Sequence, residues 1–215
     1  MKELKYLNIC TYLQELDIKI SNFLHLYSNN FENYLNKDDL IELITSKNIH
    51  LVISKYDYEF FKNIRELNEK IKIVAILDEI NHTHLLESLK LKDIKLVEDL
   101  NCLNQFCENL KECVKAIDSN KSNVLKLKND LMYDSFNKTL FKSKKIIPLT
   151  KKEIEFLDYL IQNSLRAIGY NELNEKIWDG FMTQDALRSL IKELRKKTYK
   201  ELIKNISGIG YRIDL

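Results

Sequence analysis

The sequence predicts two domains of different class, an α/β domain with a parallel sheet followed by a smaller α+β domain of helices and a hairpin. The N-terminal part alternates short apolar runs with longer amphipathic stretches, the pattern of repeated βα units. All four glycines and the only proline, Pro148, lie in the C-terminal part. Residues 1–120 carry 15 basic and 20 acidic side chains, whereas residues 121–215 carry 19 and 12. A module of net charge −5 thus precedes one of +7, and the basic module is expected to meet a polyanion.

Five short runs in the N-terminal part are typical of strands, and LVI and IVAIL are apolar throughout, as in strands buried on both faces. The predicted strands cover residues 6–9, 31–35, 51–53, 71–77 and 94–97. The amphipathic stretches between them predict helices over residues 12–26, 39–47, 58–70, 82–91 and 100–117. Because strands and helices alternate, right-handed crossovers should give a doubly wound parallel sheet with helices on both faces.

The C-terminal part contains three further helix patterns. Residues 118–129 are polar and lysine-rich and predict a linker, and residues 130–148 hold three short β-prone pieces. A helix should begin after Thr150, a favourable N-cap residue, with Glu153 completing a capping box. The remaining elements are helices over residues 171–178 and 184–197 and a closing hairpin in IKNISGIGYRIDL. Three helices followed by a two-stranded wing form a winged helix-turn-helix domain.

The C-terminal part also carries a family resemblance. The residues that carry it are IPLTKKEIEFLDYLI, NELNEKIW, LRSLIKELRKK and LIKNISGIGYRI. In this order and spacing they resemble the DNA-binding domain of OmpR/PhoB-type response regulators, the transcription regulators of two-component systems. This family keeps its receiver domain where the present chain has its βα pattern. The resemblance implies a receiver-like domain over residues 1–117, a linker over 118–129 and a winged helix-turn-helix DNA-binding domain over 130–215.

The receiver-like domain lacks the residues that the resemblance leads one to expect. Family receivers hold Mg²⁺ and a phosphoryl group with an acidic pair, an acceptor Asp, a hydroxyl and Lys-Pro, each after a strand. By strand register these positions are taken by Cys10 and Thr11, Lys55, Leu77 or Asp78, and Glu98-Asp99. A lysine at the acceptor position would repel the metal, so no phosphorylation is expected and the regulator would be atypical. The alternative is a phosphorylated regulator with a shifted register that uses Asp57 or Asp78.

The third C-terminal helix is the predicted recognition helix. Leu187, Leu190, Ile191 and Leu194 share one face and should be core, which leaves a polar, basic face opposite. Arginine and lysine on such a helix can donate to guanine N7 and O6 in the major groove. In the wing, Ser207 stands where the family commonly has an arginine. The predicted DNA contacts are Thr183, Gln184, Arg188, Ser189, Lys192, Arg195 and Lys196 from the helix, and Asn205, Ser207 and Arg212 from the wing.

The resemblance also implies partners for this regulator. They are double-stranded DNA, a second copy of the chain bound through residues about 82–117, and RNA polymerase at the loop over residues 179–184, which is short for the family. An enzyme is not predicted, because neither a nucleophile–base pair nor a glycine-rich phosphate loop is found. A second alternative from another functional class is a non-catalytic adaptor whose winged helix binds protein.

The remaining patterns predict neither a cofactor nor a metal. The four cysteines form no C-x-x-C pair, and without an export signal they should be free thiols that pack as small hydrophobes. Redox sensing by one exposed thiol is the alternative. His82 and His84 have no thiolate or carboxylate nearby in the sequence pattern and read as loop histidines. No apolar run of about 18 residues occurs, so a cytoplasmic location without a membrane span is expected.

Overall fold

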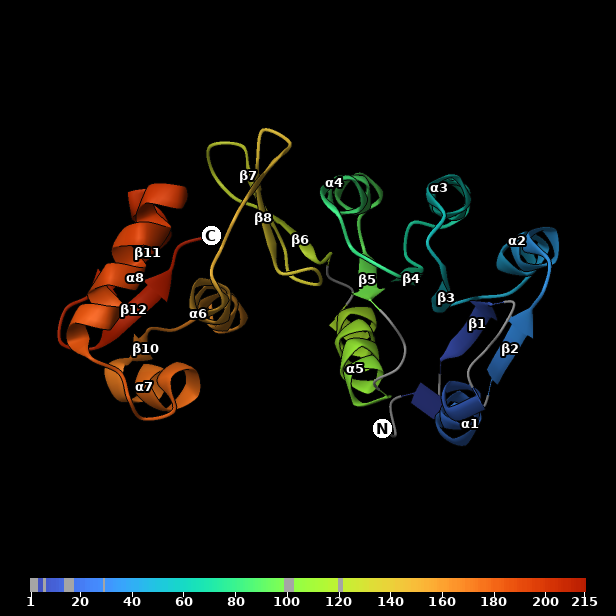
Figure 1. Cartoon of the computed structure of the whole chain (residues 1–215), viewed down its shortest axis with the longest axis horizontal. Coiled ribbons are helices and arrows are strands. Elements are labelled where there is room, and N and C mark those ends of the chain that lie inside the picture. The colour runs from blue at the N-terminus through green and yellow to red at the C-terminus, as the bar shows by residue number, and fades with distance from the viewer. Residues whose placement is uncertain (1–3, 6, 14–17, 29, 99–102, 120–121) are drawn as a thin grey trace. The chain divides into compact units, whose positions relative to one another are not determined.

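The computed structural model describes residues 4–5, 7–13, 18–28, 30–98, 103–119 and 122–215. The chain divides into two compact units, Met1–Val124 and Leu125–Leu215 (Figure 1). Each unit has its own hydrophobic core, one around β-strands of the first unit and one around the helices of the second. Within the described part of the chain, no helix combines the length and the apolar character that a membrane crossing requires.

The N-terminal unit is a five-stranded parallel sheet in the order β2-β1-β3-β4-β5. Helices α2, α3 and α4 cover one face of the sheet and α1 and α5 cover the other, which confirms the doubly wound α/β class (Figure 1). Its elements are β1 (Asn8–Tyr12), α1 (Ile18–Tyr27), β2 (Asn30–Tyr34), α2 (Lys37–Ser46), β3 (Leu51–Lys55), α3 (Tyr58–Leu67), β4 (Lys72–Leu77), α4 (His82–Leu91), β5 (Ile94–Glu98) and α5 (Leu103–Ser119).

The C-terminal unit is built from two antiparallel sheets around three helices, as the winged helix-turn-helix class predicts. One sheet has the order β6-β7-β8-β9 and the other β10-β12-β11. Its elements are β6 (Val124–Lys126), β7 (Leu131–Asp134), β8 (Thr139–Lys142), β9 (Lys145–Ile147), α6 (Lys151–Gln162), β10 (Ile168–Gly169), α7 (Tyr170–Trp178), α8 (Gln184–Lys197), the 3-10 helix η2 (Lys200–Leu202), β11 (Ile203–Ile206) and β12 (Gly210–Ile213).

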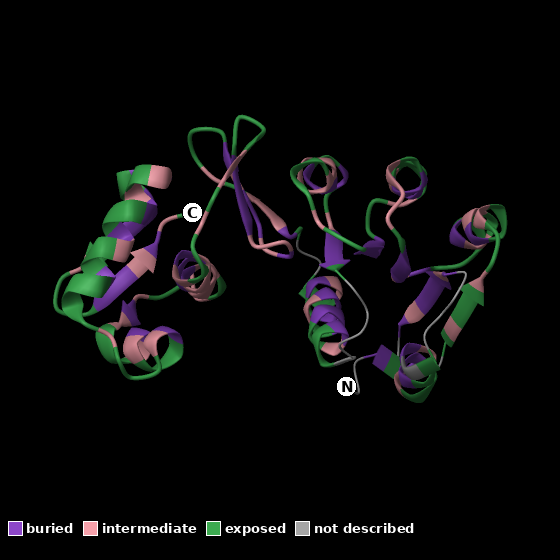
Figure 2. Ribbon diagram, in the orientation of Figure 1, coloured by how far each residue is buried: buried purple, intermediate pink, exposed green. Residues whose placement is uncertain are grey.

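Burial follows the sequence pattern in both units (Figure 2). Every residue of β4 is buried and β3 is buried up to its last residue, because helices pack on both sides of these central strands. The edge strand β2 is largely exposed. In the second unit the predicted capping box is confirmed, since the Thr150 hydroxyl accepts from the Glu153 backbone and the Glu153 carboxylate accepts from the Thr150 backbone.

The first strand lies further along the chain than predicted. β1 spans Asn8–Tyr12 instead of residues 6–9, because Leu7 donates to the Leu4 carbonyl in a turn and the β-prone Thr11 and Tyr12 continue the strand. Consequently the helix predicted from residue 12 begins, among the described residues, at Ile18. The helix predicted over 58–70 ends at Leu67, and Asn68 then accepts from the Lys70 backbone in a turn.

The linker predicted over residues 118–129 is interrupted by regular structure. Helix α5 continues to Ser119, and residues 124–126 form β6, which pairs with β7. Asn123 is held within the first unit, because its backbone N–H and its side-chain amide both lie 2.9 Å from the Asp93 carboxylate, which accepts from them. These hydrogen bonds and the sheet pairing give regular structure to part of a segment that its polar composition predicted to be a linker.

Candidate nucleic-acid interface

Helix α8 is anchored by one apolar face. The Thr183 hydroxyl caps it by accepting from the Ala186 backbone at 3.1 Å. Leu187, Ile191 and Leu194 are buried in the core of the second unit. Leu190, predicted to be core with them, is only partly buried and packs at the edge of this core. The opposite face is therefore left to solvent (Figure 2).

That outer face of α8 is exposed and rich in cations. Its exposed members include Gln184, Arg188, Ser189, Lys192 and Lys196, and the acidic Asp185 and Glu193 are exposed beside them. The Arg188 guanidinium donates to the Gln184 amide oxygen at 3.2 Å and lies 3.7 Å from Asp185. The Lys196 ammonium pairs with Glu193 at 2.6 Å. Both ion pairs join exposed side chains and contribute little free energy, because water screens them. Arg188 and Lys196 therefore remain available to bind another anion.

Arg195 differs from its neighbours, because its side chain is used within the protein. Its Nε and Nη2 atoms donate to the Ile203 carbonyl at 3.2 and 2.5 Å. This joins the last turn of α8 to the first residue of β11. Arg195, predicted with the DNA contacts, therefore holds the helix and the wing together.

The wing is a two-stranded hairpin whose polar candidates lie near its tip. Asn205 and Ser207 are exposed, whereas Arg212 on β12 is only half exposed. Gly208 has φ of 73°, so the tip needs a residue that tolerates the left-handed region. Gly210 packs closely against the backbone of β10, because a Cβ at this position would lie 1.9 Å from the carbonyl oxygen of Ile168. Its lack of a side chain therefore serves this contact and does not leave room for a phosphate.

A groove of about 460 Å³ runs between α8 and the wing, and it is hereafter called the basic groove. It is lined by Arg188, Ile191, Lys192, Arg195, Lys196, Lys200 and Tyr211. Five of these residues are cations, and the lining contains no carboxylate. Lys200 belongs to η2 and was not found by sequence reasoning, because it lies outside the helical pattern that marked the other basic residues.

The loop between α7 and α8 is closed by Asn174. Its backbone carbonyl accepts from Gly180, and its side-chain oxygen accepts from the Met182 backbone at 2.7 Å. Asp179 ends α7 in the left-handed conformation. Phe181, at the outer point of this loop, is 86% exposed.

The carboxyl edge of the parallel sheet is the second region that the sequence singled out. Because β1 extends to Tyr12, Cys10 and Thr11 lie within the strand, and Tyr12 stands at its end. Lys55 is exposed at the end of β3, as predicted. Leu77 at the end of β4 is buried. Glu98 at the end of β5 accepts from the Ile80 backbone at 2.6 Å, and Asp99 lies outside the described residues.

Asp57, the alternative acceptor, is already engaged by its neighbours. Its carboxylate accepts from the Phe60 backbone at 3.0 Å and so caps α3. The Lys37 ammonium pairs with the same carboxylate and lies 5.9 and 5.5 Å from the ring centres of Tyr12 and Phe60. Burial raises the pKa of Asp57, but hydrogen bonds from Lys37 and from the Phe60 backbone outweigh it and leave that pKa below its usual value.

The other candidate residues are histidines and cysteines. In the described part of the chain, no group of three or more His, Cys, Asp and Glu side chains is arranged to hold a metal ion. His84 accepts from the Asn81 backbone in the capping box of α4. Burial raises the pKa of Cys10 and of Cys113 to about 12, so neither is a thiolate at neutral pH. Cys102 lies outside the described residues.

Comparison with known proteins gives matches to the C-terminal part of the chain. Residues 143–213 match the family "Transcriptional regulatory protein, C terminal". Regulatory protein VanRB of Enterococcus faecalis is 37% identical over 70 residues, and response regulator protein PmrA of Pseudomonas aeruginosa is 31% identical over 70 residues. Each match covers 32% of this chain and 32% of the relative, so the chain aligns with about a third of the length of these proteins.

The fold of the whole chain also has a known counterpart. The crystal structure of response regulator DrrB, a Thermotoga maritima OmpR/PhoB homolog, matches 97% of this chain and 99% of its own, with a TM-score of 0.70. The two sequences are 21% identical over this match. The two proteins therefore share the arrangement of an α/β unit followed by a winged helix-turn-helix unit.

Proposed function

We propose that this chain, whose C-terminal domain belongs to the family of transcriptional regulatory C-terminal domains, is a response regulator that controls transcription by binding double-stranded DNA as a homodimer, without phosphorylation. The proposal places the domains as predicted, with a receiver-like domain over residues 1–117 and a DNA-binding domain over 130–215. It places the protein in the cytoplasm, where its DNA is found.

The exposed face of α8 is the observation that carries DNA binding. Arg188, Lys192 and Lys196 follow one another at single-turn spacing on this face. A helix held by its apolar side with such a row outward fits the major groove, where arginine reads guanine and lysine meets phosphates. Thr183, Gln184 and Ser189 on the helix, and Asn205, Ser207 and Arg212 on the wing, would supply further contacts.

Independence from phosphorylation is supported by the carboxyl edge of the sheet. Tyr12, Lys55 and Leu77, at the ends of β1, β3 and β4, offer no carboxylate for Mg²⁺, and the Glu98 carboxylate at the end of β5 accepts from the Ile80 backbone. The carboxylate closest in sequence to the acceptor position, that of Asp57, is paired with Lys37. The Lys37 ammonium thus lies beside the Asp57 carboxylate, and a divalent cation would have to displace this ammonium.

Dimerisation is assigned to the surface of α4, β5 and α5, over residues about 82–117. Without phosphorylation to control it, the dimer would form constitutively or in response to a ligand. The exposed Phe181 in the loop before α8 supports a contact with RNA polymerase there, as the resemblance implies.

The test of DNA binding is a gel shift of the full chain with random duplex DNA over a series of salt concentrations. Retardation that weakens steeply as salt rises is expected, because bound lysines and arginines release counterions from the phosphates. A folded protein that retards no duplex at low salt would instead support the alternative of an adaptor that binds protein.

Treatment with acetyl phosphate or beryllofluoride and Mg²⁺ distinguishes a phosphorylation-independent regulator from a phosphorylated one. Neither reagent should change the oligomeric state or the DNA affinity of the full chain. A stoichiometric acid-labile phosphate that disappears in Asp57→Asn or Asp78→Asn would show a phosphorylated regulator and refute the independence proposed here.

A further inference from the structure

We infer that the basic groove binds one phosphodiester of the DNA backbone, and that Lys200, outside the recognition helix, is one of the residues that hold it. This rests on the proposed DNA binding and adds a site to it. The groove is defined by residues of three elements, α8, η2 and β12.

The charge of the groove indicates what it binds. Arg188, Lys192, Arg195, Lys196 and Lys200 surround one volume of about 460 Å³ without a carboxylate among the lining residues. Like charges gathered in this way repel one another, and an anion placed between them removes that repulsion. The other two lining residues, Ile191 and Tyr211, are buried and bring no carboxylate, so they add no competing negative group.

The lysines of the groove differ in their availability. Lys196 pairs with Glu193 across the outer surface of α8. Lys192 and Lys200 are exposed, and neither has an ion-pair partner among the described residues. They approach the groove from two elements, α8 and η2, so an anion between them would be held from two sides.

Arg195 sets the distance between these two elements. Its guanidinium donates twice to the Ile203 carbonyl, directly after η2, and so fixes the end of α8 to the strand that follows Lys200. Arg195 is therefore a positioning residue of the groove, and the lysines of the groove are the residues that bind the phosphate.

The chemistry of the free cations favours a phosphate over a base. A lysine ammonium is a compact point charge without the planar fork that reads two acceptors of one guanine. Phosphate contacts of this kind position a protein on the duplex and are independent of sequence. The lysines of the basic groove should therefore contribute equally on any duplex.

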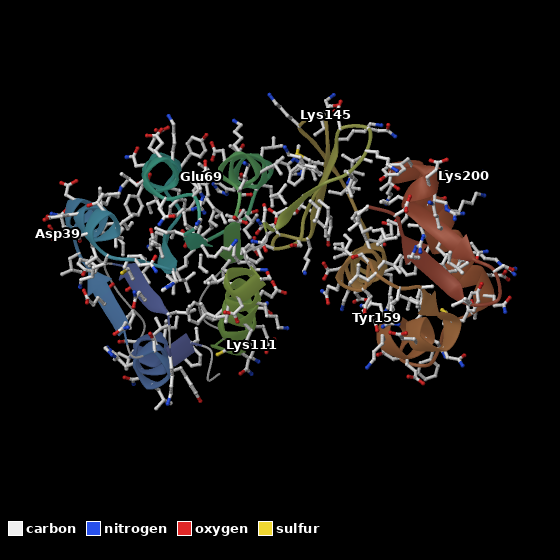
Figure 3. The ribbon with its side chains drawn as sticks, turned by 180° about the vertical axis from the view of Figure 1, so that it is seen from behind. Asp39, Glu69, Lys111, Lys145, Tyr159 and Lys200 are labelled. Atoms are coloured by element: carbon white, nitrogen blue, oxygen red, sulfur yellow. The ribbon has the colours of Figure 1, made fainter. Side chains whose placement is uncertain are left out.

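The experiment compares Lys200→Ala with Lys145→Ala in the full chain, on random duplex DNA over a salt series. Lys145 is an exposed lysine on β9 and does not line the groove (Figure 3). Lys200→Ala should reduce the slope of log affinity against log salt by roughly one, because one phosphate contact is lost. Lys145→Ala should leave the slope unchanged, and Lys200→Arg should restore it.

A second measurement locates the phosphate. On a duplex obtained by binding-site selection, single phosphates are replaced one at a time by neutral methylphosphonates. At one position per half-site, the replacement should lower the DNA affinity of the wild type but should not lower the affinity of Lys200→Ala any further.

The outcomes separate the two proposals. If the wild type binds DNA but Lys200→Ala has the same slope as Lys145→Ala, the phosphate site is refuted and DNA binding stands. A wild type that binds no duplex at all refutes the proposed function, and the phosphate site with it.

Discussion

The Lys197 ammonium lies 2.7 Å from the Glu153 carboxylate, which at the same time accepts from the Thr150 backbone at 2.7 Å. The Glu153 side chain is only 5% exposed. One buried carboxylate thus completes the capping box of α6 and binds the last turn of α8. The direction in which the recognition helix points depends on this pair as well as on the apolar core.

Glu153→Gln is expected to destabilise the C-terminal unit by about 1–3 kcal/mol, because the hydrogen bond from Lys197 loses its charged acceptor. Glutamine can still cap the helix, so the change reports on Lys197. Urea unfolding measures the effect, and Glu175→Gln, an exposed position on α7, is the matched control. Equal unfolding midpoints for both variants would contradict a stabilising role of the pair.

Arg188→Ala should cost on the order of 1–3 kcal/mol on the preferred site and little on random DNA, since a base contact is lost. Lys196→Ala should weaken binding to the preferred site and to random DNA nearly equally. It should also reduce the salt slope by roughly one, because one phosphate contact is lost. Binding of each variant to selected and scrambled duplexes measures this. Equal losses on both duplexes for Arg188→Ala would show that Arg188 only positions the protein.

The dimer is expected to respond to a charge on the exposed side of α4. Leu89 is 9% exposed and belongs to the interior of its own subunit, so a charge there would unfold the protein. Leu86 is half exposed on the same helix. Leu86→Glu should shift the full chain toward monomer in sedimentation, whereas Leu67→Glu, an exposed leucine on α3, should not. A wild type that stays monomeric up to high concentration would refute constitutive dimerisation.

Acid should selectively remove the stabilisation that Glu172 provides. Hydrogen bonds from Arg166 and Tyr159 lower the pKa of Glu172 to about 2, from a usual value of 4.5. Its stabilising contribution is therefore complete above about pH 4.5 and disappears as the pH falls toward 2. Glu172→Gln should lower the unfolding midpoint at pH 7, and the gap from the wild type should narrow below pH 4.5. A gap that is independent of pH would contradict this assignment.

Local patterns determined most of the fold. The apolar runs LVI and IVAIL predicted the two central strands, since strands covered on both faces have no polar side to alternate with. Thr150 and Glu153 predicted the start of α6, because a capping box is formed within four residues. The bounds of α8 were predicted correctly from its regular apolar face, and the structure adds Thr183 as its cap.

Contacts made in the folded chain decided the rest. β6 exists because residues 124–126 find a partner in β7, and β1 ends at Tyr12 because its neighbour β3, about 40 residues away in sequence, pairs as far as Ser54. Sequence predicted a DNA contact for Arg195, and the structure adds that its guanidinium donates to the carbonyl of Ile203. Lys200 lines the basic groove because the chain folds back after α8 and places η2 beside it. Charge and periodicity are properties of the chain, but which charged side chain faces solvent and which bonds to the protein is set by how the elements pack, whether they are near or far apart in sequence.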